Sequence, residues 1–375
     1  MPDLVMRKIL EDCDFCTVLV VRKVCRALRD FIDNSFINSS LKRVHIDISI
    51  QSIILKVTFS NGGKKYKFKR IQYQHKYEDD CKMEISMNDG SGRTSKEILF
   101  ENTSFVQLFC DDLERILRAN DSIFENISVN FRGGPRKVFK VVVKEECSKI
   151  YGIFEKVFCL KNRRKTIRVI EYDYTETMTK VMEAMERSLM YRKLKVASFH
   201  MYPVPRDIQF MNIVNNIDAT CLKKLEVNGL QDVILKNGVH LGTEIIEERI
   251  KWENMKFFCL WPFITSIPVQ KLAHIPIVKI KYETISAEDI LYLKEVVINS
   301  PATYRFTIGS KTKIDVNFLI KVLGPLSKQF YVGPFIWCFE IPGTRKIKVI
   351  TCNQTSNWLV FTIEPRYKYR SYVVY

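Results

Sequence analysis

The first 33 residues constrain the fold of this chain more than any other segment does. Apolar side chains return there at helical spacing, and the spacing is broken twice, near residues 12–14 and near Cys25. The pattern predicts three short helices, with Pro2 at a helix start and Thr17 as the cap of a second helix. About thirty residues in three short helices cannot bury this much apolar surface alone. The surplus predicts a helix-in-groove or helix-on-helix contact with another surface.

The same segment matches a known pattern: Leu-Pro, Leu or Val, Ile-Leu, Leu, Arg-x-Val-Cys, and an aromatic residue or Leu. The matching residues are Pro2, Leu4, Ile9, Leu10, Leu19, Arg22, Val24, Cys25 and Leu28. The segment therefore resembles the F-box, and the chain resembles the nematode F-box proteins with a C-terminal FTH domain (F-box A type). Met1, Cys13 and Leu28 depart from the pattern, and the smaller Cys13 predicts a weaker partner contact. An ordinary N-terminal hairpin packed on its own domain is the alternative.

The resemblance implies that the N-terminal helices dock on a Skp-type adaptor and, through it, on a cullin. The apolar contact or its supporting core would consist of Pro2, Leu4, Ile9, Leu10, Leu19, Val24, Cys25 and Leu28. The larger domain would hold an unidentified target protein. The predicted function is a substrate-recognition subunit of an SCF-type (cullin-based) ubiquitin ligase, which needs no catalytic residue of its own.

Length and cysteine content agree with a protein of the cytoplasm or nucleus. The 375 residues are enough for a small module and a larger domain. No run approaches 18 apolar residues, so no transmembrane helix is expected. The opening Met-Pro-Asp is wrong for a secretory signal. The 11 cysteines are scattered, which favours reduced thiols over a disulfide framework.

The formal net charge of +17 is distributed unevenly. Residues 1–40 hold six basic and six acidic side chains, whereas residues 41–75 hold eight basic side chains and one acidic. Basic and aromatic side chains give candidates for a target-binding surface: Lys64, Lys67, Arg163, Arg164, Tyr367 and Tyr369. A solvated basic face is the simplest interpretation. An acidic protein is the favoured partner, and nucleic acid is disfavoured.

The chain divides into three predicted regions. Residues 1–40 form the F-box. Residues 41–100 form a connecting region with a strand over 44–50, where apolar and polar residues alternate, a β-hairpin around Asn61 and a mobile loop over 74–97. Residues 101–375 form the FTH or leucine-rich-repeat-like target-binding domain, in which helices are predicted over 105–119 and 145–159.

An apolar-x-x-apolar-x-apolar pattern recurs along the third region. It starts at Ile167, Leu194, Leu222, Met255, Ile275, Thr303 (a polar first position) and Ile336. With helical stripes between these runs, the pattern resembles an irregular leucine-rich-repeat solenoid. The runs around Trp252, Leu272 and Ile285 also resemble the FTH family. The predicted fold class is α/β: an N-terminal three-helix F-box followed by an irregular leucine-rich-repeat-like α/β solenoid.

Motifs for catalysis and cofactors are missing from the sequence. Cys13 and Cys16 have a metal-like separation, but a structural zinc site needs four ligands and no second pair follows. The five histidines lack metalloprotease spacing, and no glycine-rich phosphate loop occurs. We therefore expect no enzyme, cofactor or metal. A repeat-type interaction scaffold without a ligase role, or a basic nucleic-acid-binding protein, are the alternative functions.

Overall fold

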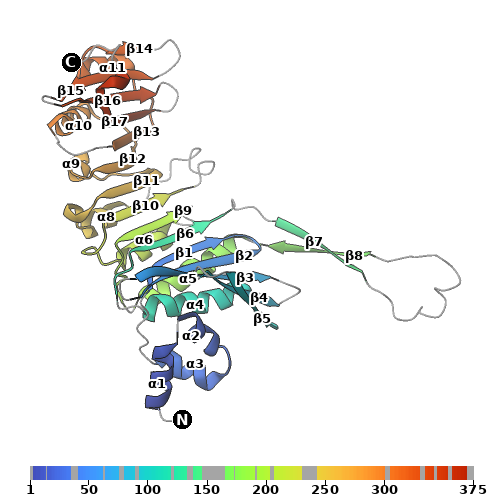
Figure 1. The fold of residues 1–375 in the computed structure, drawn as a ribbon. Helices are drawn as coiled ribbons and strands as arrows, with labels where there is room; N and C mark the ends of the chain where they lie inside the picture. Colours follow the sequence, from blue (N-terminus) through green and yellow to red (C-terminus); the bar gives the residue numbers. More distant parts are fainter. Residues whose placement is uncertain are drawn as a thin grey trace, which may run out of the picture.

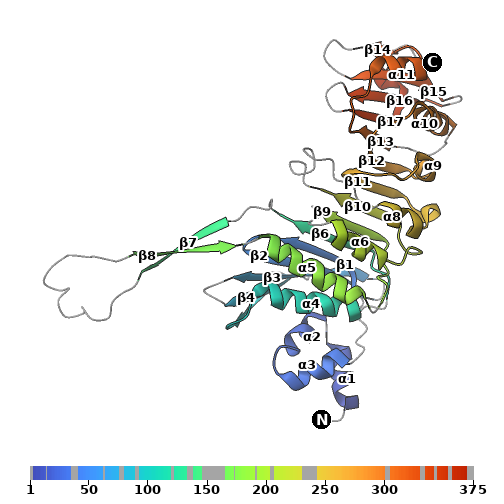
Figure 2. The ribbon, with the colours of Figure 1, turned by 180° about the vertical axis from the view of Figure 1, so that it is seen from behind.

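The computed structural model shows three N-terminal helices followed by one long mixed sheet with helices along one face (Figures 1 and 2). The N-terminal helices are α1 (Asp3–Asp12), α2 (Phe15–Val21) and α3 (Arg26–Asn34). The structure describes residues 3–13, 15–34, 41–61, 64–75, 80–88, 93–119, 122–132, 138–145, 165–172, 174–190, 192–202, 207–229, 243–299, 305–329, 334–341, 344–353 and 357–369.

Fifteen strands within these ranges form a single sheet, in the order β14-β15-β16-β17-β13-β12-β11-β10-β9-β6-β1-β2-β3-β4-β5. Their bounds are β1 (Leu41–Ile48), β2 (Ser52–Asn61), β3 (Lys64–His75), β4 (Cys81–Asn88), β5 (Arg93–Phe100), β6 (Asn126–Phe131), β9 (Ser198–Tyr202), β10 (Lys224–Asn228), β11 (Phe257–Ile264), β12 (Ile277–Tyr282), β13 (Arg305–Ser310), β14 (Lys328–Gln329), β15 (Phe335–Glu340), β16 (Lys346–Asn353) and β17 (Trp358–Pro365). A separate antiparallel pair joins β7 (Val138–Glu145) and β8 (Lys165–Tyr172).

The middle of the sheet is parallel, from β1 through β6, β9, β10, β11 and β12 to β13, and both ends are antiparallel. Parallel neighbours require long crossover connections, which helices usually supply. The helical segments after the N-terminal three are α4 (Phe105–Ala119), α5 (Tyr174–Leu189), α6 (Asp207–Asn215), α8 (Thr243–Arg249), η1 (Trp252–Asn254), α9 (Val269–Leu272), α10 (Ala287–Asn299), α11 (Val316–Leu323) and η2 (Arg366–Tyr369).

The main core lies between the sheet and the helices. One row of side chains crosses all seven parallel strands in register: Val44, Ile127, Phe199, Leu225, Phe258, Val278 and Phe306. Each is at most 1% exposed. Full burial of one such side chain contributes about 1.5–3 kcal/mol. The alternate side chains of these strands point to the opposite face, which we call the open face.

Several local predictions are confirmed. Helix α4 spans the predicted residues 105–119, β1 follows the predicted alternation, and β2 and β3 form the predicted hairpin. Five starting positions of the apolar pattern stand shortly before the strands β9 to β13: Leu194, Leu222, Met255, Ile275 and Thr303. Thr303 itself lies outside the described residues. None of the helices in the described ranges has the length and apolarity that a bilayer crossing requires.

Two expectations are wrong, and a third falls almost wholly outside the described residues. Residues 81–88 and 93–100 are paired strands rather than a mobile loop, because charged residues alternate with the buried side chains of Cys81 and Met83 and make the segment look polar. Ile167 lies in β8, outside the main sheet, and Ile336 lies in the antiparallel β15. Of the helix expected over 145–159, residue 145 ends β7 and the remainder lies outside the described residues.

Two further strands carry the same apolar pattern and were not counted among its repeats. Leu41, Val44 and Ile46 supply it in β1, and Phe124 leads into it in β6. The parallel part of the sheet therefore begins with β1, at residue 41. The strands of residues 41–100 and most of the later strands belong to one sheet.

Candidate interaction surfaces

The N-terminal helices have a small core of their own. Leu10 from α1, Val18 from α2 and Ile32 from α3 are buried against one another. Around them pack Met6, Cys13, Val21 and Phe31. Leu10 therefore belongs to the supporting core of the predicted contact, and Cys13 packs against that core.

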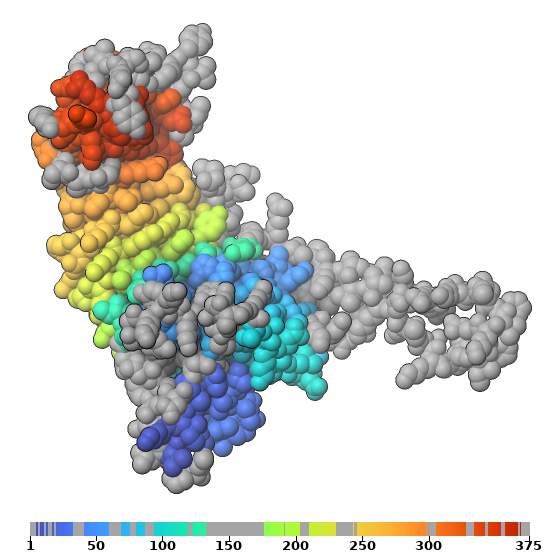
Figure 3. Space-filling model, in the orientation of Figure 1, coloured from blue at the N-terminus to red at the C-terminus, as the bar shows by residue number. Residues whose placement is uncertain are grey.

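Other apolar side chains of α1 and of the turn between α2 and α3 face solvent. Val24 is 70% exposed, and Val5 and Ile9 are 45% exposed each. Cys25 is exposed next to Val24, and Leu28 is half-buried. Figure 3 shows the helices in blue as a lobe at one end of the molecule. Several exposed apolar side chains on so small a module are typical of an interaction site.

The remaining predicted contact residues are not placed. Leu4 lies in α1 and Leu19 lies in α2, but the side chains of both are outside the described part of the structure, as is all of Pro2. Ile9, Val24, Cys25 and Leu28 are thus the predicted residues whose side chains the structure makes available to a partner.

A buried ion pair joins the N-terminal helices to the sheet domain. Lys23 Nζ lies 2.5 Å from Asp112 Oδ2, and the side chains of Lys23 and Asp112 are 6% and 0% exposed. Tyr73 Oη donates a hydrogen bond to the same carboxylate oxygen, at 2.6 Å. Lys23 Nζ also lies 5.6 Å from the ring centroids of Tyr73 and Phe100. Aromatic faces and a carboxylate together compensate the desolvated ammonium.

Two further contacts hold the same junction. Arg115 Nη2 from α4 donates a hydrogen bond to the backbone carbonyl of Ile32 in α3. Val20, in α2, packs against the main core rather than the small one. The exposed apolar side chains of the N-terminal helices are therefore held in a fixed orientation relative to the sheet.

The open face of the sheet carries polar and titratable side chains. One row, in register across the parallel strands, consists of His45, Ser128, His200, Glu226, Cys259, Lys279 and Thr307. Burial lowers the pKa of His200 and raises that of Cys259 to about 12. Cys259 is therefore protonated at neutral pH and is a poor nucleophile. Among the described residues, no group of three or more His, Cys, Asp or Glu side chains could hold a metal ion.

Asp47 is the most buried charge on this face, at 2% exposure. Its Oδ2 lies 3.0 Å from both Lys56 Nζ and Arg132 Nη2, and its Oδ1 accepts a hydrogen bond from Asn130 Nδ2 at 3.3 Å. Burial alone would raise the pKa of Asp47. The hydrogen bond from Lys56, the charge of His45 and the hydrogen bond from Asn130 outweigh burial, so the pKa lies below its ordinary value.

We expect Asp47→Asn to lower the free energy of unfolding by about 1–3 kcal/mol at pH 7. A depressed carboxyl pKa stabilises the folded state above the unfolded-state value of about 3.9, and this stabilisation disappears as the pH falls through the folded value. Urea unfolding at pH 7 and pH 3 measures the difference. A gap between the two proteins that is equally large at pH 3 would refute this role of the Asp47 charge.

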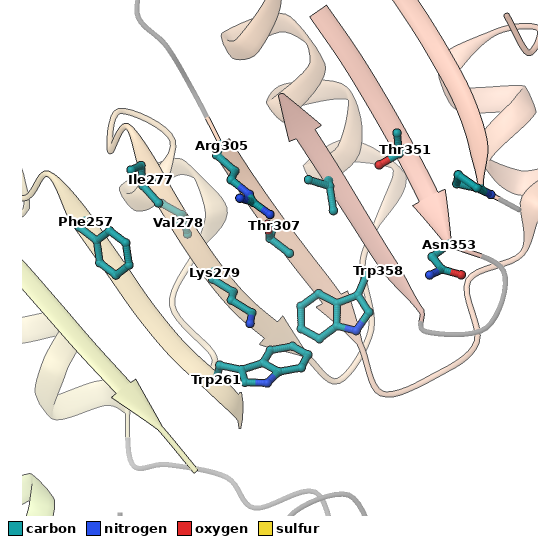
Figure 4. Close-up of a pocket in the computed structure, with 12 residues that line it drawn as sticks. Phe257, Trp261, Ile277, Val278, Lys279, Arg305, Thr307, Thr351, Asn353 and Trp358 are labelled. Carbon is teal, nitrogen blue, oxygen red and sulfur yellow. The ribbon is translucent and has the colours of Figure 1, made fainter. Parts of the chain in front are cut away.

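An aromatic groove occupies the open face where the parallel strands meet the antiparallel end. Its volume is about 650 Å³, and Figure 4 shows side chains from β11, β12, β13, β17 and β16 around it. The ring centroids of Trp261 and Trp358 lie 3.6 Å apart at an angle of 50°. Lys279 Nζ lies 4.3 Å from the centroid of the Trp261 ring. Phe257, Arg305 and Thr307 also line the groove.

Gly309 sets the floor beneath Trp358. A Cβ at Gly309 would stand 2.6 to 2.9 Å from three carbons of the Trp358 ring, closer than atoms can approach. Gly309↔Trp358 is also a paired position between β13 and β17. The missing side chain of Gly309 therefore allows Trp358 to lie flat and to reach Trp261.

Gly309→Ala is expected to push the Trp358 ring out of the groove and to cost about 1–3 kcal/mol through overpacking. Tryptophan fluorescence of the full chain should change, because Trp261 and Trp358 would lose their ring contact. Gly324→Ala is an unsuitable control, because Gly324 has a φ of 93°. Thr307→Ala keeps the floor open and serves instead. An unchanged spectrum for Gly309→Ala would mean that Trp358 does not depend on this glycine.

The target-binding residues predicted from the sequence are not among the described side chains that line this groove. Arg163 and Arg164 lie outside the described residues. Lys64 and Lys67 lie in β3, and Tyr367 and Tyr369 lie in η2, but the side chains of all four are outside the described part of the structure. The role of these six residues in target binding stays a prediction. A usable sequence signal for the groove is the alternation of Phe257, Cys259 and Trp261 along one face of β11.

Comparison with protein-family models finds an F-box domain at residues 1–39 and an FTH domain at residues 176–326. The comparisons with curated proteins and with solved structures gave no match. The first domain contains α1 to α3 with their exposed apolar side chains. The second begins within α5 and includes β11, β12 and β13 of the groove, whereas β16 and β17 lie beyond its end.

Proposed function

We propose, for a chain that is an F-box protein with a C-terminal FTH domain, the role of substrate-recognition subunit in an SCF-type ubiquitin ligase. Its F-box helices dock on a Skp-type adaptor, which binds a cullin, and its larger domain recruits a target protein. The observation that carries this proposal is the exposure of Ile9 in α1 and of Val24 in the turn between α2 and α3, in a module that already possesses a core.

The chain contributes proximity rather than chemistry. Holding a target beside the conjugating enzyme turns an intermolecular encounter into a nearly intramolecular one, with a high effective concentration of the target lysine. Such a gain depends on geometry, since it vanishes where the two sites cannot be engaged together. The buried Lys23–Asp112 pair supports this role because it fixes the F-box helices on the sheet domain.

We also propose that the parallel strands form an irregular leucine-rich-repeat-like solenoid. In its support, β9, β10, β11, β12 and β13 follow one another in both chain order and sheet order. The second apolar position of four of these patterns (Leu225, Phe258, Val278 and Phe306) falls in one core row, which Phe199, the third position of the pattern from Leu194, continues. Stacked units of this kind present a continuous open face, which suits the capture of a partner.

Size-exclusion chromatography of the purified full chain with a purified Skp-type adaptor tests the proposed function. A contact of standard size predicts co-elution at about 10 μM of each protein, and addition of the cullin should shift the complex to a larger species. If the chain elutes alone while its circular dichroism shows that it is folded, the result contradicts the proposed ligase role. A scaffold indifferent to the adaptor is then favoured.

A further inference from the structure

The groove on the open face has walls that suit large apolar side chains. Trp261 and Trp358 form one wall and Phe257 forms the other, each half-buried with part of its ring exposed. Aromatic rings of this kind bind other rings, or proline, by offset or edge-to-face contact. Indole rings that line an open groove gain little from folding alone and are typical anchors for a partner.

Two cations stand in the same groove. Lys279 and Arg305 belong to its lining, and the described residues of the lining include no Asp or Glu. The nearest carboxylate along the row, Glu226, lies 2.9 Å from Lys224 Nζ and is already engaged. No ion pair of Lys279 or Arg305 is present within the part of the chain that the structure describes. A partner that brings carboxylates would therefore meet uncompensated positive charge.

The shape of the groove fits an extended chain. Its lining comes from five neighbouring strands, β11, β12, β13, β17 and β16, which at about 4.8 Å per step span roughly 19 Å. About six residues of extended polypeptide, at 3.3 Å each, cover this length. A phosphate backbone fits less well, since nucleic-acid grooves carry a series of cations rather than two.

We infer that this groove takes an extended acidic segment of the target protein. An aromatic or proline side chain of the segment packs against Trp261 and Trp358, and neighbouring carboxylates pair with Lys279 and Arg305. The inference rests on the proposed function, which it deepens by naming the chemistry of the recruited segment. It places target recognition at the junction of the FTH domain with the C-terminal strands β16 and β17.

The inference is tested by selecting peptides from an immobilised library of random nonapeptides with the full chain. The selection is done at about 150 mM salt to suppress long-range electrostatic attraction. Selected peptides should be enriched in Asp or Glu beside Phe, Tyr, Trp or Pro. Affinity for a selected peptide should fall about tenfold or more in Lys279→Glu/Arg305→Glu, which should prefer the same peptide with Lys in place of Glu. Trp358→Ala should weaken binding without changing the preference for acids.

The control for overall charge is Lys313→Glu/Lys321→Glu, which changes the net charge equally at two exposed positions outside the groove. It should retain the acidic preference. The inference is overturned if no peptides are selected, if the groove variant and the control behave alike, or if a 20-nucleotide single-stranded DNA competes equally well. Adaptor binding by the groove variant is measured in parallel. If this variant loses peptide binding but still binds the adaptor, the proposed function is unaffected. If the wild-type chain does not bind the adaptor, the proposed function itself is contradicted.

Discussion

Val24→Asp should weaken adaptor binding on the order of 100-fold, about 2.7 kcal/mol, while the chain stays folded. The expected loss is large because a carboxylate placed in an apolar interface is desolvated without a partner. The fold should survive because Val24 is 70% exposed in the free chain. Substitutions at such positions usually change the free energy of unfolding by less than about 0.5 kcal/mol. Isothermal titration calorimetry with the purified adaptor gives the affinity, and urea unfolding gives the stability.

Met190→Asp is the matched control, since Met190 is 69% exposed and follows α5, outside the F-box domain. It should bind the adaptor as the unmodified chain does. Leu10→Asp offers a contrast, because Leu10 is 1% exposed in the small core. That variant should lose adaptor binding together with the helical signal of α1 to α3. Equal adaptor binding by Val24→Asp and Met190→Asp would remove Val24 from the contact.

Lys23→Ala should destabilise the chain by about 3–5 kcal/mol, because it leaves the buried Asp112 carboxylate without its cation. Among the described residues, Tyr73 would then be the remaining side-chain donor to that carboxylate. The loss should also free the F-box helices from the sheet domain, so amide hydrogen exchange in α3 should accelerate. Urea unfolding by circular dichroism and exchange by mass spectrometry measure the two effects.

A double variant separates the charge from the packing at this junction. Lys23→Met/Asp112→Leu should recover much of the lost stability, because apolar replacements of a buried ion pair are often neutral or better. Lys8→Ala, at an exposed lysine of α1, should leave stability nearly unchanged. If Lys23→Ala and Lys8→Ala unfold alike, the ion pair contributes nothing to the attachment of the F-box.

Local patterns in the sequence predicted much of the fold. The apolar stripe of α4 and the alternation in β1 depend on residues a few positions apart, so they could be predicted. The repeated apolar pattern also located β9 to β13. In a chain with 46% hydrophobic residues the same three positions coincide elsewhere, which is why Ile167 and Ile336 were included although neither lies in a parallel strand of the main sheet.

The two proposed interaction surfaces differ in how far the sequence could specify them. The F-box contact depends on a short motif, so its exposed members Val24 and Cys25 were named in advance. The groove depends on Trp261 and Trp358, which are distant in the sequence and meet only because β13 pairs with both β12 and β17. Lys23 likewise gives no local signal of its partner, Asp112.

The reactivity of Cys25 tests most directly whether the F-box helices present a surface that a second protein covers. Cys25 is exposed next to Val24, whereas Cys221 is half-buried and remote from the F-box. Alkylation of the folded chain by iodoacetamide, resolved by mass spectrometry, should modify Cys25 readily when the chain is alone and slow about tenfold or more under saturating adaptor. The rate at Cys221 should not change. A Cys25 that is unreactive in the free chain, or that reacts equally fast in both states, would contradict the proposed docking surface.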